Sequence, residues 1–123
     1  MSINKDHLSE EEIEITQNCG TEPPFSGKLL YEKREGIYKC IVCNNQLFES
    51  ETKFDSGTGW PSFYDAIGET VSSKEDNSFG IKRIEINCKK CKSHLGHIFN
   101  DGPTPTGLRY CVNSLSLGFD IVE

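Results

Sequence analysis

The sequence has no long apolar run. No window reaches the roughly 18 consecutive apolar residues that a membrane-spanning helix needs, and Met1–Leu8 is too polar for the apolar core of an export signal. Internal repeats and low-complexity segments are also absent. We therefore expect no membrane partner and a cytoplasmic location.

Positive charge is also scarce, because 13 lysines and arginines face 19 aspartates and glutamates, for a net charge of -6. Nucleic-acid-binding surfaces are basic, so this balance predicts no nucleic-acid partner. A chain of 123 residues can bury roughly two-thirds of its unfolded surface without help from another subunit. We expect residues 1–123 to form one domain and the protein to be a monomer.

Helix signals are confined to the N-terminal part. Ser9-Glu10-Glu11-Glu12 matches a capping box and predicts a short helix to about Thr16. Residues 65–80 are polar, and we expect them to form a surface excursion of mixed structure. Strands are predicted for Ile37–Val42, Gln46–Glu49, Ile81–Asn87, Leu108–Ser114 and Leu115–Phe119. Short strands between glycine and proline turns predict a mainly antiparallel β domain with a minor N-terminal helix.

Four of the six cysteines form two Cys-x-x-Cys pairs, which are Cys40 with Cys43 and Cys88 with Cys91. Four thiolates on two tight turns are typical of a closed, structural Zn²⁺ site with Zn–S distances of about 2.3 Å. The 44 residues between the pairs require two distant segments to meet in space. Redox dithiols and disulfides are the alternatives, and a reducing compartment favours the metal.

Cys111 lies outside both pairs and is the candidate nucleophile. On a strand, period-two alternation places Arg109, Cys111 and Asn113 on one face and apolar side chains on the other. Arg109 and two nearby histidines would provide the electropositive surroundings that favour a thiolate.

His94 and His97 are the candidate proton donors, because histidine titrates near neutrality. They are three residues apart, so a regular strand would point them to opposite faces. Both can reach one site only if the strand is broken at Gly96 by a turn or a bulge.

Three kinds of function fit these residues. A Cys-His-Asn set could catalyse acyl transfer, as in cysteine peptidases. Cys111 could instead attack an oxidised sulfur, become a sulfenic acid and condense with a second thiol. The leftover Cys19 favours this redox chemistry, since acyl transfer does not need it. A non-catalytic zinc-stabilised β module, with Trp60 as a binding wall, is the third possibility.

The chain resembles the B-class peptide methionine sulfoxide reductases, which act on the R epimer of the sulfoxide. The resemblance covers about residues 13–119, the expected core of the domain. It rests on both Cys-x-x-Cys pairs and on the motifs Gly20-Thr21-Glu22-Pro23-Pro24-Phe25-Ser26-Gly27, Lys53-Phe54-Asp55-Ser56-Gly57, Gly59-Trp60-Pro61-Ser62-Phe63, His94-Leu95-Gly96-His97 and Arg109-Tyr110-Cys111-Val112-Asn113-Ser114.

This resemblance implies two antiparallel sheets, a structural four-cysteine zinc site far from the chemistry, and Cys111 as the nucleophile that becomes a sulfenic acid. It also implies that Trp60 packs on the methyl group of the sulfoxide, with Phe99 in the same wall. The residues implied to position and protonate the sulfoxide oxygen are His94, His97 and Asn113, with Arg109 and Asp101 orienting them.

The sequence departs from the family at one position. Many members carry a resolving cysteine between the glycines before the tryptophan, where this chain has Thr58. Some members carry an alternative thiol in the proline-rich loop, where Cys19 stands. The resemblance therefore implies a Cys19–Cys111 disulfide after turnover, reduced by thioredoxin. Direct reduction of the sulfenic acid by a small thiol is the competing route.

Overall fold

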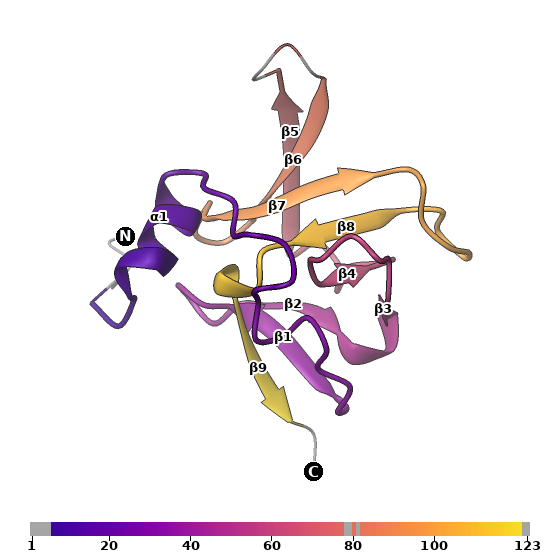
Figure 1. Cartoon of the computed structure of the whole chain (residues 1–123), viewed down its shortest axis with the longest axis horizontal. Coiled ribbons are helices and arrows are strands. Elements are labelled where there is room, and N and C mark those ends of the chain that lie inside the picture. The colour runs from indigo at the N-terminus through magenta and orange to yellow at the C-terminus, as the bar shows by residue number, and fades with distance from the viewer. Residues whose placement is uncertain (1–5, 78–79, 81, 122–123) are drawn as a thin grey trace.

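The protein folds into two antiparallel β-sheets, shown in a computed structural model that describes residues 6–77, 80 and 82–121 (Figure 1). The elements are α1 (Glu10–Gln17), β1 (Gly36–Cys40), β2 (Gln46–Glu49), η1 (Ser50–Thr52), β3 (Lys53–Phe54), β4 (Ser62–Phe63), β5 (Val71–Asp76), β6 (Arg83–Cys88), β7 (His94–Phe99), β8 (Arg109–Val112), η3 (Ser114–Ser116) and β9 (Leu117–Ile121), where η marks a 3₁₀ turn. The predicted class, mainly β with two antiparallel sheets and a short N-terminal helix, is confirmed.

The small sheet has the order β2-β1-β9, and the large sheet has the order β3-β4-β8-β7-β6-β5. The turn η3 joins β8 to β9 and so carries the chain from one sheet to the other (Figure 1). One hydrophobic core joins the two sheets. At its centre the Phe63 ring of the large sheet stacks on Phe48 at 4.3 Å between centroids and meets Tyr38 edge-on at 5.0 Å.

Helix α1 has the predicted capping box. The Glu12 N–H donates to Ser9 Oγ at 3.1 Å, and the Ser9 N–H donates to Glu12 Oε1 at 2.8 Å. The helix packs against η3 and β7 and buries Ile15. It is followed by Cys19 in the left-handed region, with φ 56°. No helix among the described residues is long and apolar enough to cross a membrane.

Some strands were not located by the sequence. Residues 71–76, expected within a surface excursion of mixed structure, form the edge strand β5, and the short strands β3 and β4, which lie on either side of Trp60, were not predicted. β5 is an edge strand with largely solvated side chains, so it lacks the apolar alternation that marks a strand. The predicted strand Leu115–Phe119 starts only at Leu117, after η3. Of the predicted strand Ile81–Asn87, Ile81 lies outside the described residues.

Strand register gives the large sheet one apolar and one polar face. Glu85 of β6 pairs with His97 of β7, and His97 pairs with Cys111 of β8. Directly opposed residues of neighbouring strands point to the same face, so these three side chains form one row across the sheet. The neighbouring row contains Ile86 and Val112, both fully buried in the core. The predicted division of β8 into an apolar and a chemical face is confirmed.

Candidate functional site

The four paired cysteines come together where the β1–β2 turn of the small sheet meets the β6–β7 turn of the large sheet. Their sulfur atoms all lie within 4.8 Å of one another, and the Cys40–Cys91 and Cys43–Cys88 sulfur pairs are 3.6 Å apart. A tetrahedral ion with metal–sulfur bonds of about 2.3 Å requires sulfur separations of about 3.8 Å. The cluster fits a structural metal site, with all four positions filled by protein.

Amide groups of the two turns support this site. Asn45 Nδ2 donates to Cys88 Sγ at 3.7 Å. Backbone N–H groups of Asn45 and Cys91 also bond to the sulfurs of Cys43 and Cys88. Thiolates are the form that ligates a metal, so the donor set matches the chemistry of the cluster.

His94 and His97 lie on the same face of the sheet, which is possible because strand β7 is interrupted next to Gly96. The pairing of β6 with β7 shifts by one residue between Ile86 and Asn87, which makes Leu95 the extra residue of a bulge next to Gly96. The shift returns His94 to the face that carries His97, and the two ring centroids are 5.7 Å apart.

A cavity of about 110 Å³ opens over Cys111. It is lined by Thr21, Trp60, Arg83, Gly96, His97, Phe99, Cys111, Val112 and Asn113. The structure thus brings together five of the predicted site residues, namely Cys111, His97, Asn113, Trp60 and Phe99. Ligand pockets for whole small molecules are about 300–1,000 Å³, so this cavity matches the end of a side chain.

The thiol of Cys111 is only partly accessible, and its surroundings favour the protonated form. Burial raises its pKa above the ordinary value, and the Glu22 carboxylate raises the pKa further. The charge of Arg109 and a hydrogen bond with Thr58 act in the opposite direction, but burial dominates. This hydrogen bond places Thr58 beside the Cys111 sulfur.

Trp60 and Asn113 are fixed by the loop that follows α1. The Trp60 indole N–H donates to the Glu22 carbonyl oxygen at 2.9 Å. The Asn113 side-chain oxygen accepts the Glu22 N–H at 3.0 Å, and its Nδ2 donates to the Leu95 carbonyl at 3.1 Å. Glu22 is itself buried, with its carboxylate accepting the Leu115 N–H at 2.9 Å. The amide group of Asn113 thus connects this loop to the bulge in β7.

Arg109 and Asp101 lie at the edge of the site. Arg109 donates two hydrogen bonds to the Asp101 carboxylate, at 2.9 and 3.2 Å, and its guanidinium lies 4.3 Å above the centroid of the Phe99 ring. Neither residue lines the cavity over Cys111. They hold Phe99 in place, and Arg109 also acts on the Cys111 thiol through its charge.

His97 bonds to a carboxylate that sequence reasoning missed. A hydrogen bond of 2.9 Å joins His97 Nε2 to Asp76 Oδ2, and Arg83 Nη2 contacts the same carboxylate oxygen at 3.3 Å. Asp76 belongs to β5, the strand that the sequence did not predict.

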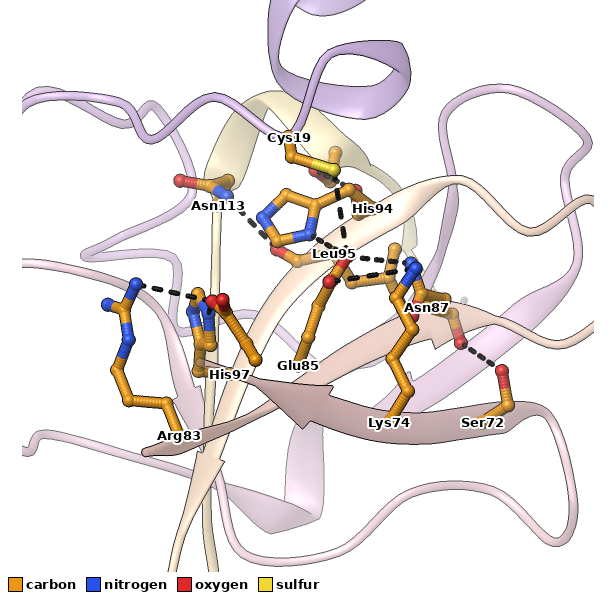
Figure 2. A network of polar contacts seen from close by, with 12 residues as sticks. Cys19, Ser72, Lys74, Arg83, Glu85, Asn87, His94, Leu95, His97 and Asn113 are labelled. Carbon is orange, nitrogen blue, oxygen red and sulfur yellow. Dashed lines mark hydrogen bonds and ion pairs between the residues drawn. The ribbon is translucent and has the colours of Figure 1, made fainter. Parts of the chain in front are cut away.

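His94 and Cys19 lie away from the cavity, on the same polar face. His94 Nδ1 is 2.8 Å from Glu85 Oε2, and the Cys19 thiol donates to the same oxygen at 3.8 Å (Figure 2). Glu85 is on β6 and Cys111 on β8, so their backbones are about 9.5 Å apart across two strand spacings. All six cysteines are reduced. In this state Cys19 does not contact Cys111.

Comparison with known proteins agrees with this geometry. The family model described as the SelR domain matches residues 8–121. Two proteins named peptide methionine sulfoxide reductase MsrB, from Escherichia coli O139:H28 (strain E24377A / ETEC) and E. coli strain K12 / DH10B, are each 57% identical over 116 residues. The matched region covers 94% of this chain and 85% of each relative.

The chain belongs to the SelR-domain family, that of the B-class peptide methionine sulfoxide reductases, and the resemblance drawn from its motifs is confirmed. Membership makes it an enzyme, an oxidoreductase that acts on sulfur. The sequence had left two alternatives open, a cysteine peptidase and a non-catalytic zinc module. Membership of the SelR-domain family favours neither.

Proposed function

We propose that this enzyme reduces the R epimer of methionine sulfoxide, mainly in proteins and peptides, through a sulfenic acid on Cys111. The observation that carries the proposal is the cavity of about 110 Å³, in which Cys111 faces His97, Asn113 and an aromatic wall. A cavity that accepts only the end of a side chain suits a residue within a polypeptide.

The first step transfers the sulfoxide oxygen to Cys111. The Cys111 sulfur attacks the sulfoxide sulfur as its S–O bond breaks. The oxygen then bonds to the Cys111 sulfur while the transient sulfur–sulfur bond breaks, and the products are methionine and Cys111–SOH. The thiol proton is conserved in the product hydroxyl group. Attack becomes easier when a proton reaches the oxygen in the transition state, and His97, held by Asp76, is the proton donor that lines the cavity.

The remaining cavity residues bind and orient the sulfoxide. Trp60 and Phe99 supply apolar surface for the methyl group, and the bond from the Trp60 indole to Glu22 fixes the ring. Asn113 lines the same cavity and positions the sulfoxide oxygen. His94 assists through its contact with the His97 ring, and Arg109 with Asp101 orients Phe99.

The second step forms a Cys19–Cys111 disulfide and releases water. The Cys19 sulfur attacks the Cys111 sulfur, and its proton leaves with the hydroxyl group. A disulfide requires Cα atoms within about 7 Å. Since Cys19 rests at Glu85, two strands from Cys111, the loop after α1 moves in each cycle. Thioredoxin then reduces the disulfide by thiol exchange.

Single-turnover and steady-state assays test both steps. Wild-type enzyme should release one equivalent of methionine from an R-sulfoxide peptide without reductant and turn over with thioredoxin. Cys111→Ser should release none while remaining folded. Cys19→Ser should release one equivalent but fail to turn over with thioredoxin. Equal thioredoxin-driven turnover by Cys19→Ser would show that Cys19 does not resolve the sulfenic acid.

We assign Zn²⁺ to the four-cysteine cluster, in a structural role. Zn²⁺ is a borderline-soft ion that readily accepts four soft thiolate ligands in a tetrahedral set. Metal analysis of freshly purified protein should find one zinc per chain, and Cys91→Ser should lose zinc and lower the melting temperature. Cys19→Ser is the matched control and should keep its zinc. Protein without zinc that contains four titratable thiols at these positions would refute the assignment.

The cellular setting completes the proposal. Four cysteines used as metal ligands rather than in structural disulfides suit a reducing compartment, so we place the enzyme in the cytoplasm, where thioredoxin is available. We also propose that residues 1–123 act as a single-domain monomer. Sedimentation of the purified protein at two concentrations tests the oligomeric state, because a dimer would show a concentration-dependent mass.

A further inference from the structure

A second group of metal-binding side chains lies on the polar face of the large sheet, outside the four-cysteine cluster. We propose that Cys19, Glu85 and His94 form an open site for a divalent transition ion such as Zn²⁺. The three side chains bring one sulfur, one oxygen and one nitrogen ligand from the loop after α1, from β6 and from β7 (Figure 2).

The geometry requires only small movements. The three ligand atoms lie within 4.8 Å of one another. Cys19 Sγ is 3.8 Å from Glu85 Oε2, and His94 Nδ1 is 2.8 Å from the same oxygen. Around a tetrahedral zinc ion with bonds of about 2.0–2.3 Å, neighbouring ligands are roughly 3.3–3.7 Å apart. His94 Nδ1 and Glu85 Oε2 must therefore move slightly apart, whereas the separation of Cys19 Sγ from Glu85 Oε2 is already close to that of two zinc ligands.

Two of the ligands are buried and held in place. His94 is 3% exposed and Glu85 is 7% exposed. The Glu85 carboxylate also accepts a hydrogen bond from Asn87 Nδ2 at 3.0 Å, which orients it. His94 Nε2 is buried with no hydrogen-bond partner among the described residues. When Nδ1 binds the ion, the ring proton moves to this nitrogen.

Cys19 supplies both access and selectivity. Its side chain is exposed, so an ion can reach the site from solvent. The site then resembles zinc sites with three protein ligands and one open position. A thiolate beside an imidazole also selects zinc or cobalt over magnesium and calcium, which prefer oxygen ligands.

Charge favours a divalent ion here. A Cys19 thiolate and the Glu85 carboxylate together carry two negative charges, which one divalent cation neutralises. Without an ion, burial and the Glu85 charge raise the pKa of the Cys19 thiol. Lys74 opposes the ion, because its Nζ is 3.8 Å from Glu85 Oε1. Binding therefore releases the Cys19 proton and displaces the Lys74 side chain toward solvent.

An occupied site has a consequence that rests on the proposed function. The ion would hold the Cys19 sulfur over β6, away from the Cys111 sulfenic acid. Release of the first methionine would continue, while formation of the Cys19–Cys111 disulfide would stop. Free zinc would thus inhibit recycling of the enzyme without blocking its first chemical step.

Metal binding can be measured independently of activity. Full-length protein with the four-cysteine site already filled by zinc is dialysed against buffered Zn²⁺, and Co²⁺ is titrated in parallel to detect thiolate-to-cobalt absorption. We expect one further ion per chain. Cys19→Ser and Glu85→Gln should lose it, and Cys111→Ser, the matched thiol control, should keep it. Lys74→Ala should bind several-fold more tightly, an effect that damage to the fold would not produce.

The outcomes separate the two proposals. Absence of the further ion in wild-type protein, or its retention by Cys19→Ser, overturns the metal site whatever the activity of the enzyme. If the ion binds but methionine sulfoxide is not reduced, the metal site stands and the proposed function fails. If both hold, protein with one added equivalent of Zn²⁺ should still release one equivalent of methionine in a single turnover, while thioredoxin-driven turnover is suppressed.

Discussion

Gly96 packs against the carbonyl group of Cys111, so closely that a β-carbon at Gly96 would overlap the Cys111 carbonyl oxygen. The obstacle is backbone, which cannot move aside as a flexible side chain can. Gly96 belongs to the bulge that brings His94 and His97 to one face. The absence of a side chain at this position therefore sets the distance between the histidine strand and the nucleophile strand.

Gly96→Ala should separate β7 from β8 and misplace His97 relative to Cys111. We expect a loss of about 1–3 kcal/mol in the free energy of unfolding, as for other overpacked sites, and about a 100-fold loss of sulfoxide reduction, since a displacement near 1 Å can cost that much. Urea unfolding and steady-state kinetics measure the two effects. Gly118→Ala is the control, because the nearest neighbours of its β-carbon are the flexible side chains of Lys39 and Ile41. It should change the free energy of unfolding and the rate of sulfoxide reduction much less than Gly96→Ala.

Alkylation of Cys111 in the free enzyme should be slow at neutral pH. Burial raises the pKa of this thiol, so the rate should rise only at a pH above the ordinary thiol value of about 8.5. Arg109→Gln removes a charge that lowers this pKa and should move the profile to still higher pH. Iodoacetamide rates against pH, measured in a Cys19→Ser background, test this. A profile that Arg109→Gln leaves unmoved would contradict the role given to the guanidinium.

Glu22 should make the folded protein less stable as the pH rises. Burial raises the pKa of its carboxyl group in the folded state. Its full contribution is therefore present below the unfolded value of about 4.3 and is lost as the pH rises through the folded value. The stability of wild-type protein relative to Glu22→Gln should fall between pH 4 and pH 7. Urea midpoints at several pH values measure the difference, and a constant difference would contradict the prediction.

Asp76→Asn should impair catalysis through His97. The substitution keeps the size of the side chain but removes the carboxylate that bonds to His97 Nε2. A positioned proton donor contributes roughly 10²–10⁴-fold to a rate, and we expect kcat to fall about 10- to 100-fold with KM little changed. Glu75→Gln is the matched control, because Glu75 is on the other face of β5 and pairs with Lys82. Equal losses in both variants would indicate a structural effect.

Local signals in the sequence were sufficient for part of this structure. The capping box at Ser9 and the two Cys-x-x-Cys turns depend on residues close in sequence, and all formed as predicted. Alternation in β8 identified the face that carries Cys111. The convergence of His94 and His97 was predicted only on condition of a break at Gly96, since sequence alone does not reveal a shift of strand register.

The partners of the site residues depend on contacts between distant segments. Glu22 bonds to the backbone of Leu115, and Asp76 bonds to His97 across the sheet. Nothing in the sequence distinguishes Glu22 or Asp76 from an acidic residue that is exposed to solvent. Glu85 likewise occupies an ordinary polar position of a strand, yet it is buried and joins His94 to Cys19. Such roles follow from register, which the amino-acid pattern of one strand does not determine.

The four-cysteine cluster has a consequence for unfolding. Two of its ligands belong to the small sheet and two to the large sheet, so one bound ion ties both sheets into a single cooperative unit. With the ion in place, the sheets should melt together in one transition. After chelation, the small sheet, which has only three strands, should become the first part of the chain to exchange its amide hydrogens.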